Sequence, residues 1–283
     1  MLTMVEGNEI DGRALTHKAR HARRDQLKLM KMSRWSDWLW AAEGYAEAVD
    51  WLLSHPKNIR KGAYLSYSSF KEVWRYTLPA GFGGETIIYK YFDYNRKSLG
   101  TRLKLSMATN EALNSVALRE MGISVADVLA CGENRHVGFL SGAFLITRCI
   151  PDSLDGSVLM PKGSLRDKDK LRFGFAKTAM EGIAKAHLCG CFHSEFHAHK
   201  LLFPMECDED NPQVTWIDVA KCQFSPDISM KRAILLDLVR FFVDLRLSSN
   251  EIKKLCNHYL QFNPNCGYSV PTLWEAMTEL KPI

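Results

Sequence analysis

The chain has 283 residues, 46% hydrophobic and 24% charged, which is the balance of an ordinary globular protein with a sizeable core. No uninterrupted apolar run approaches the ~20 residues of a membrane-spanning helix, and residues 1–13 lack the apolar core of a secretory leader. We therefore expect a cytoplasmic protein whose eight scattered cysteines are reduced thiols.

The net charge of +5 is concentrated near the N-terminus, because residues 13–31 contain seven basic residues and one acidic residue. Trp35, Trp38 and Trp40 follow directly. A basic segment beside tryptophans is typical of contact with an anionic bilayer surface or with nucleic acid. The simpler interpretation is a solvated basic helix whose tryptophans dock on the core.

The first predicted element is helical. Residues 14–54 have apolar side chains at helical spacing, including Leu39, Tyr45 and Val49. Residues 1–60 are therefore expected to form a basic, helical N-terminal extension.

From residue 63 the pattern is mainly that of strands, and from residue 169 onward it is mostly helical. This order predicts an α+β fold with a β-rich N-lobe at 61–150 and a helical C-lobe at 151–283, and a ligand site between them. The expected strands are 63–68, 72–78, 86–92, 125–131, 136–147 and 214–219, with a helix at 104–121 and a polar linker at 151–168.

Lys90 and Glu111 are candidate site residues on this framework. Lys90 shares a strand face with Ile88 and Phe92, and a lysine on an apolar face requires an anionic partner. Glu111, on the following helix, is a suitable partner that would hold Lys90 against nucleotide phosphates. The alternatives are an edge-strand lysine and a solvated helix glutamate.

Two further candidates lie in the C-lobe. In the loop His193-Ser-Glu195-Phe-His-Ala-His-Lys200, Glu195 would face the acceptor hydroxyl and His193 would brace the loop through hydrogen bonds. Asp218 closes the apolar strand Val-Thr-Trp-Ile-Asp, where its carboxylate is suited to Mg²⁺. A lone aspartate is more often a turn or cap residue, but this loop followed by this strand is the layout of a kinase site.

These landmarks together resemble the lipopolysaccharide kinase family, the WaaP and Kdo-kinase group, over roughly residues 63–250. The resembling segments are the lysine strand and glutamate helix from IIYKYF to LREMGI, then FLITRCIPDSL, HSEFHAHKLLF, WIDVAK and KRAILLDLVRFF. The resemblance implies a bilobal protein-kinase-like fold.

The resemblance also implies ATP and Mg²⁺ as cofactors and a set of roles. Asp218 would bind the metal, and Asp237 would brace the catalytic loop. Glu195 and His193 would be catalytic. The nucleotide would contact Lys90, Glu111, Ser68, Ser69, Lys71, Thr147 and Cys149.

The chain departs from the family pattern at three places. Glu195 stands where relatives have aspartate, and the extra methylene moves the carboxylate by more than ~1 Å, a misplacement that can cost ~10²-fold in rate. Lys200 stands where kinases commonly have a metal-binding asparagine, and residues 66–71 contain no glycine to approach phosphates closely. A pseudokinase of the same fold, acting as a regulatory or binding protein, is the alternative function.

A third hypothesis is a metal-binding protein. Residues 187–199 contain several cysteines and histidines, which are typical zinc ligands, although their alternating spacing is unlike the usual zinc knuckle. The roles of Lys200, His197 and His199 stay open. The ligand candidates are His187, Cys189, Cys191, His193, His197 and His199.

The acceptor follows from the resemblance alone. It would be a sugar hydroxyl of the lipopolysaccharide inner core, heptose or Kdo, or of a related lipid-linked glycan. Residues 13–40, extended by Arg96, Lys97, Arg102 and Lys104, would then meet the cytoplasmic face of the inner membrane. No nucleic-acid partner is expected.

Overall fold

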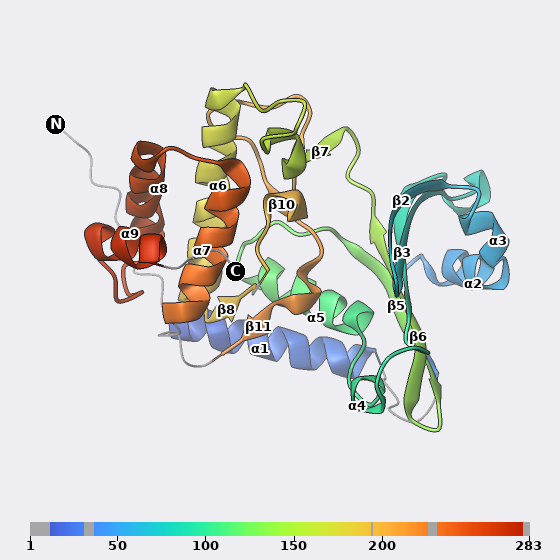
Figure 1. The fold of residues 1–283 in the computed structure, drawn as a ribbon. Coiled ribbons are helices and arrows are strands. Elements are labelled where there is room, and N and C mark those ends of the chain that lie inside the picture. Colours follow the sequence, from blue (N-terminus) through green and yellow to red (C-terminus); the bar gives the residue numbers. More distant parts are fainter. Residues whose placement is uncertain (1–11, 31–36, 194, 226–230, 280–283) are drawn as a thin grey trace.

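The computed structural model describes residues 12–30, 37–193, 195–225 and 231–279. Its N-lobe is built on a six-stranded antiparallel sheet, and its C-lobe is mostly helical (Figure 1). In spatial order the strands are β1 (Trp38–Ala41), β5 (Val128–His136), β6 (Phe139–Arg148), β4 (Thr86–Asp93), β3 (Lys71–Thr77) and β2 (Ala63–Ser68).

Alternating side chains on β4 cover both faces of this sheet. Ile87 and Tyr89 pack into a cluster with helix α2 (Ala46–Ser54), whereas Phe92 packs with helix α5 (Met107–Glu120). Lys90 lies on the Phe92 face and is buried. The alternation therefore places one lysine on the side of the sheet that α5 covers.

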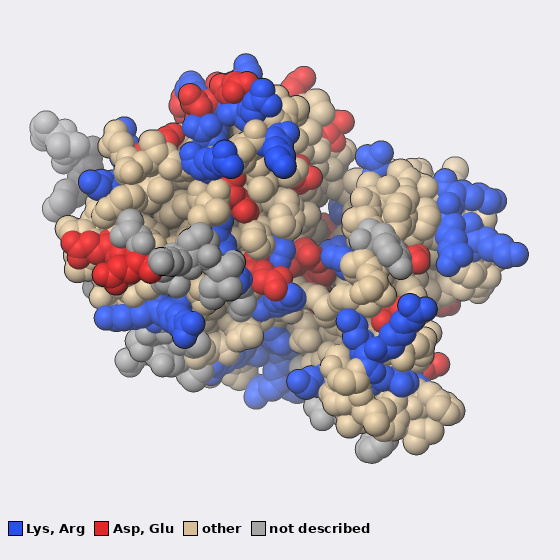
Figure 2. Space-filling view, in the orientation of Figure 1, with Lys and Arg blue, Asp and Glu red and all other residues tan. Residues whose placement is uncertain are grey.

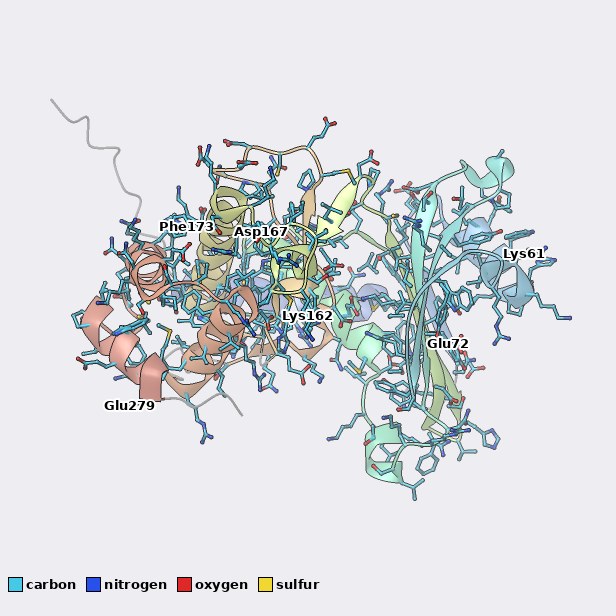
Figure 3. All side chains as sticks on the ribbon, turned by 45° about the horizontal axis from the view of Figure 1, so that its top comes forward. Lys61, Glu72, Lys162, Asp167, Phe173 and Glu279 are labelled. Atoms are coloured by element: carbon cyan, nitrogen blue, oxygen red, sulfur yellow. The ribbon has the colours of Figure 1, made fainter. Side chains whose placement is uncertain are left out.

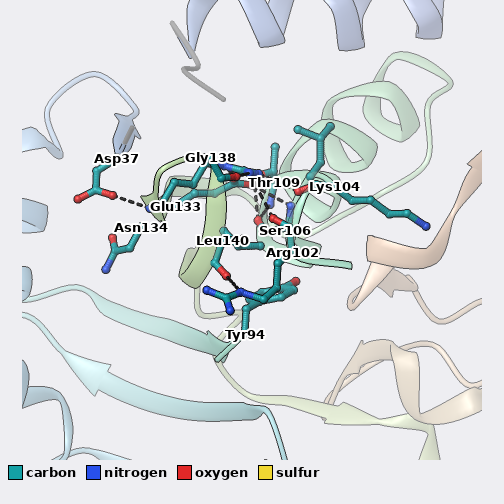
Figure 4. Close-up of polar contacts among 12 residues, drawn as sticks. Asp37, Tyr94, Arg102, Lys104, Ser106, Thr109, Glu133, Asn134, Gly138 and Leu140 are labelled. Carbon is teal, nitrogen blue, oxygen red and sulfur yellow. Dashed lines mark hydrogen bonds and ion pairs between the residues drawn. The ribbon is translucent and has the colours of Figure 1, made fainter. Parts of the chain in front are cut away.

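The N-terminus of α5 is fixed by a buried polar network (Figure 4). The Ser106 side chain caps the helix by accepting from the Thr109 N–H at 3.0 Å, and Tyr94 OH accepts from the Met107 N–H at 2.7 Å. Glu133 accepts from the Ser106 N–H at 2.8 Å and is itself paired with Arg135 at 2.7 Å. With the Met107 and Thr109 donors of its first turn satisfied in this way, α5 is held against the sheet.

Helix α1 (Gly12–Leu29) packs along α5 and runs beneath both lobes (Figure 1). Its Arg23 donates to Asn114 on α5, and Asn114 in turn donates to the carbonyls of Val219 at 2.8 Å and Cys222 at 3.0 Å. The N-terminal helix thus contacts the N-lobe helix and, through it, a C-lobe loop.

The prediction of continuous helix over residues 14–54 was wrong at Trp38–Ala41, which pair with β5 as the edge strand β1. Aromatic residues favour a pleated, half-buried surface, and this preference outweighed the helical spacing. Trp38 is buried and Trp40 packs partly against the same cluster, so neither faces outward as a membrane anchor. Trp35 and Lys31 lie outside the described residues.

The remaining strand and helix predictions agree with the structure to within a few residues, except that β5 continues five residues beyond the expected end at 131. The short helices α3 (Pro56–Ile59) and α4 (Leu99–Arg102) complete the N-lobe. The expected linker at 151–168 includes a short strand, β7 (Ser153–Asp155), and the expected strand at 214–219 is β10 (Thr215–Trp216). β7 and β10 both pair with β9 (Leu201–Pro204).

The C-lobe surrounds a large apolar core that includes Phe175, Phe203 and Phe241. β8 (Cys191–Phe192) pairs with β11 (Gln223–Phe224), which brings the loop after β10 back beside the loop after β8. No helix of the described residues has the length and apolar character needed to cross a bilayer. The helices are α6 (Asp169–Leu188), α7 (Lys231–Leu245), α8 (Ser249–Phe262) and α9 (Val270–Glu279).

Candidate active site

Lys90, Glu111 and Asp218 meet where the sheet, α5 and the C-lobe come together. The Lys90 ammonium lies 2.6 Å from Glu111 Oε1 and 3.4 Å from Asp218 Oδ1. Burial alone would lower the pKa of Lys90, but the two carboxylates outweigh it and raise the pKa to about 12. The structure therefore holds a charged lysine between two carboxylates from different lobes.

Asp218 follows β10 in a left-handed backbone conformation, with φ 58° and ψ 44°. Aspartate tolerates this region better than bulky or branched residues. Burial would raise the pKa of its carboxyl, but Lys90, Lys71 and Lys200 outweigh burial and hold the pKa well below its usual range. Asp218 is therefore an anion at neutral pH, surrounded by cations.

Lys71 reaches the same carboxylate from the β2–β3 hairpin. Its ammonium lies 3.4 Å from Asp218 Oδ2. The hairpin thus brings a cation to the site, at the place where the sequence lacks glycine. Ser69 is exposed, and the Ser68 hydroxyl is buried without a hydrogen-bond partner among the described residues.

Asp237 on α7 contacts the loop after β8 through the main chain. Its Oδ2 accepts from the His193 N–H at 2.8 Å and lies 3.3 Å from His187 Nε2. The His193 ring makes no hydrogen bond to any described residue, which differs from the expected side-chain bracing. It packs instead beside Phe196 and Trp216.

Glu195 is held by two lysines. Its carboxylate pairs with Lys221 and lies 3.6 Å from the ammonium of Lys200. Burial would raise the pKa of Glu195, but these lysines outweigh it and lower the pKa. Lys200 is buried, and its carbonyl accepts from the Ile217 N–H at 2.9 Å, which joins the loop after β8 to the segment before Asp218.

The junction between the lobes carries acidic and basic side chains close together (Figure 2). Side chains of both lobes fill this region, with the labelled Glu72 on the N-lobe side and Lys162 on the C-lobe side (Figure 3). Thr147 and Cys149, two of the expected nucleotide contacts, lie at the end of β6, where Thr147 is buried and the Cys149 N–H donates to the Thr86 carbonyl at 3.1 Å.

The cysteines and histidines of residues 187–199 separate into different environments. Cys189 and Cys191 are buried, and His187 is 2.9 Å from Tyr259 OH. Among the described residues, the three donors that come close enough for a metal ion are His197, His199 and Asp244. The structure therefore gathers a different ligand set from the one that the sequence indicated.

Several residues at or beside this site were not predicted from the sequence. Lys221 lies three positions after Asp218, and Asn114 lies three positions after Glu111, on the adjoining turn of α5. Asp244 lies seven positions after Asp237, two helical turns along α7 and on the same face. Helical spacing from a predicted site residue was the available signal for Asn114 and Asp244.

A family model described as the lipopolysaccharide kinase (Kdo/WaaP) family matches residues 93–259, more than half of the chain. The chain belongs to this family. This confirms the resemblance stated above, and the match includes Glu111, the catalytic loop, Asp218 and Asp237. No curated protein sequence matches the chain.

The chain is similar in structure to a solved protein described as WaaP in complex with acyl carrier protein. The TM-score is 0.60 at 16% sequence identity, and the alignment covers 86% of this chain and 94% of that chain. At this identity the likeness shows the fold. It confirms the predicted α+β class with a β-rich N-lobe and a helical C-lobe.

Proposed function

We propose that the protein is an ATP- and Mg²⁺-dependent kinase that phosphorylates a sugar hydroxyl of the lipopolysaccharide inner core, heptose or Kdo, or of a related lipid-linked glycan. The observation that carries this proposal is the contact of Lys90 with both Glu111 and Asp218. It joins a phosphate-binding cation to a metal-binding carboxylate across two lobes. Membership of the family supports the same chemistry.

In this proposal, Lys90 and Lys71 are the cations for the ATP phosphates. Glu111 is buried and fixes the Lys90 ammonium at 2.6 Å, so the cation is preorganised before ATP arrives. Lys71 enters from a hairpin whose tip carries the exposed Ser69, and its side chain would move from Asp218 to phosphate oxygen when ATP binds. Thr147 and Cys149 would lie along the adenine side, at the end of β6.

The donor set fits one protein-held Mg²⁺. Asp218 is an anionic, partly exposed carboxylate, and Mg²⁺ typically takes one or two carboxylates together with substrate phosphates. Lys200 cannot ligate a cation, so a second protein-held ion does not fit there. A bound Mg²⁺ would neutralise charge on the phosphates, and Lys200, 3.6 Å from the Glu195 carboxylate, would supply further positive charge.

Glu195 would orient the acceptor hydroxyl. Its lowered pKa keeps it ionised at neutral pH, so it accepts a hydrogen bond from the hydroxyl and takes the proton as the phosphoryl group is transferred. The contacts with Lys221 and Lys200 position the carboxylate on its longer side chain. Asp237 would hold the loop by its bond to the His193 N–H.

The acceptor is lipid-linked in this proposal, so part of the surface would meet an anionic membrane. The structure favours the end of the N-lobe near α4, where Leu99, Leu103 and Val137 are exposed beside the exposed Arg96 and Lys104. Lysine and arginine side chains also gather along the lower edge of the molecule, where α1 and α4 lie (Figure 2). Apolar and basic residues together are typical of interfacial binding.

The test is transfer of labelled γ-phosphate from ATP to purified lipopolysaccharide core. We expect wild-type turnover that falls by about 10²-fold or more in Glu195→Gln, since the variant keeps the shape and loses the proton acceptor. Asp167→Asn, at an exposed position, is the matched control and should keep turnover. Loss of turnover in both variants alike would count against a specific role for Glu195.

A pseudokinase is the second candidate, and one observation favours it. Lysines pair with both functional carboxylates, Lys71 and Lys90 with Asp218, and Lys200 and Lys221 with Glu195. A wild type that binds ATP but transfers no phosphate to lipopolysaccharide core would favour this candidate over the kinase.

A further inference from the structure

The catalytic loop and helix α7 form a second cluster of ligating side chains. His197 and His199 come from the loop, and Asp244 comes from the last turn of α7. One donor atom from each residue lies within 4.8 Å of the other two. None of the three is needed for the phosphoryl-transfer roles proposed above.

The distances within the cluster approach those of a metal centre. His197 Nδ1 lies 3.1 Å from Asp244 Oδ2, and two ligands on one tetrahedral zinc are roughly 3.3 Å apart when each bond is ~2.0 Å long. The His197 and His199 rings are stacked, with centroids 5.2 Å apart and planes inclined by 15°. Because His199 is exposed, a side-chain rotation can bring its nitrogen closer.

The carboxylate is already fixed in place. Asp244 Oδ2 accepts from the Ala198 N–H at 2.8 Å, which anchors it between the two histidines. Such outer hydrogen bonds typically support metal ligands.

We propose that His197, His199 and Asp244 bind a divalent transition-metal ion of the zinc class. The ion would take the place of the proton shared by His197 Nδ1 and Asp244 Oδ2, and it would link the loop to α7. Three protein ligands leave a position open to water or to an anionic oxygen. The site is independent of the Mg²⁺ that Asp218 would hold, and independent of the proposed kinase activity.

The experiment is calorimetric titration of the metal-free full-length protein with Zn²⁺, repeated with Co²⁺ to obtain a spectrum. We expect one high-affinity site, a rise in Tm with Zn²⁺, and Co²⁺ bands of nitrogen and oxygen ligands without thiolate charge transfer. His197→Ala/His199→Ala and, separately, Asp244→Asn should weaken binding by about 10²-fold. Asp244→Asn keeps an acceptor for the Ala198 N–H, so it preserves the loop.

The matched control is a second histidine pair. His17 and His21 on α1 have Nε2 atoms 3.0 Å apart and could bind metal without a carboxylate. His17→Ala/His21→Ala should leave the high-affinity site intact. The proposal is overturned if this control variant loses the site, if the Co²⁺ complex shows thiolate bands, or if wild-type protein binds no zinc.

Discussion

At the scale of single residues, Lys90 is a buried cation that depends on its partners. Replacing it by methionine would leave Glu111 buried at 3% exposure without its closest counter-charge. Removing one member of a buried pair typically costs 3–5 kcal/mol. We expect Lys90→Met to lower the free energy of unfolding by about 3 kcal/mol in urea titration.

Lys61→Met, at an exposed position, is the control for Lys90→Met and should change stability little. Adding Glu111→Leu to Lys90→Met should restore part of the loss, because no buried charge is then unpaired. A Lys90→Met protein as stable as wild type would mean that the pair contributes nothing to the fold.

His193 predicts a pH dependence of stability. Burial, followed by the charge of Lys200, lowers its pKa to about 4, whereas an unfolded histidine titrates near ~6.5. Between these values the unfolded chain binds the additional proton, so this contribution is present above pH ~6.5 and is lost as pH falls. From pH 7.5 to 5, wild type should lose about 2 kcal/mol more stability than His193→Gln.

Urea unfolding at the two pH values measures this difference, and His136→Gln, at an exposed position, controls for general histidine titration. Parallel pH profiles for wild type and His193→Gln would show that the ring is not held neutral by burial.

How far sequence predicts a site depends on the kind of contact. The order of Lys90, Glu111 and Asp218 was readable because strand alternation and family motifs fix each one separately. The 2.6 Å contact is a property of the folded chain. Lys221 was not predicted, because a long side chain on a loop has no periodic pattern that points toward Glu195.

At the scale of elements, α1 connects the parts that carry the site. The Arg23 guanidinium contacts Asn114 and lies 5.2 Å above the Phe224 ring, and Asn114 bonds the loop after Asp218. The sequence pattern predicted this helix as part of a basic N-terminal extension at residues 1–60. Charge alone did not distinguish Arg23, which packs inward, from exposed arginines such as Arg20 and Arg24.

Arg23→Ala should therefore loosen α1 from α5. We expect the free energy of unfolding to fall by about 1.5–3 kcal/mol, the range for a hydrogen bond to a charged group, and the amides of residues 219–222 to exchange faster. Hydrogen exchange measured by mass spectrometry reports both regions. Arg20→Ala, on the same helix but exposed, should leave exchange unchanged. Equal effects of the two variants would mean that the Arg23–Asn114 contact does not hold α1 against α5.

At the scale of the whole molecule, the membrane proposal concerns one end of the N-lobe. Deleting α1 would not test it cleanly, because α1 packs on α5. Leu99→Ser/Leu103→Ser should weaken binding to vesicles of anionic phospholipid by about 10-fold, if each leucine contributes ~0.7 kcal/mol on partial insertion. Sedimentation with sucrose-loaded vesicles measures the binding.

Leu65→Ser, on strand β2, is the control, since Leu65 is 50% exposed and lies outside this end of the lobe. If the double variant and wild type bind vesicles equally well, the end of the N-lobe near α4 is not the membrane contact.

The two-lobe architecture was predictable because the change from strands to helices near residue 150 is a property of chain order. The edge strand β1 was not, since a four-residue strand within an apolar helical pattern gives too short a signal. The polar network around Glu133 could not be predicted from the sequence either, because its members are up to 98 positions apart.

Calorimetric titration with ATP and Mg²⁺ tests the central claim most directly, which is that Lys90 and Asp218 form a nucleotide site. We predict Mg²⁺-dependent ATP binding by wild type that weakens by at least about 10-fold in both Lys90→Ala and Asp218→Asn, since each loses a charged contact worth more than ~1.4 kcal/mol. Lys61→Ala should bind as wild type does. Absence of ATP binding by correctly folded wild type, or binding that neither site variant changes, would contradict the account.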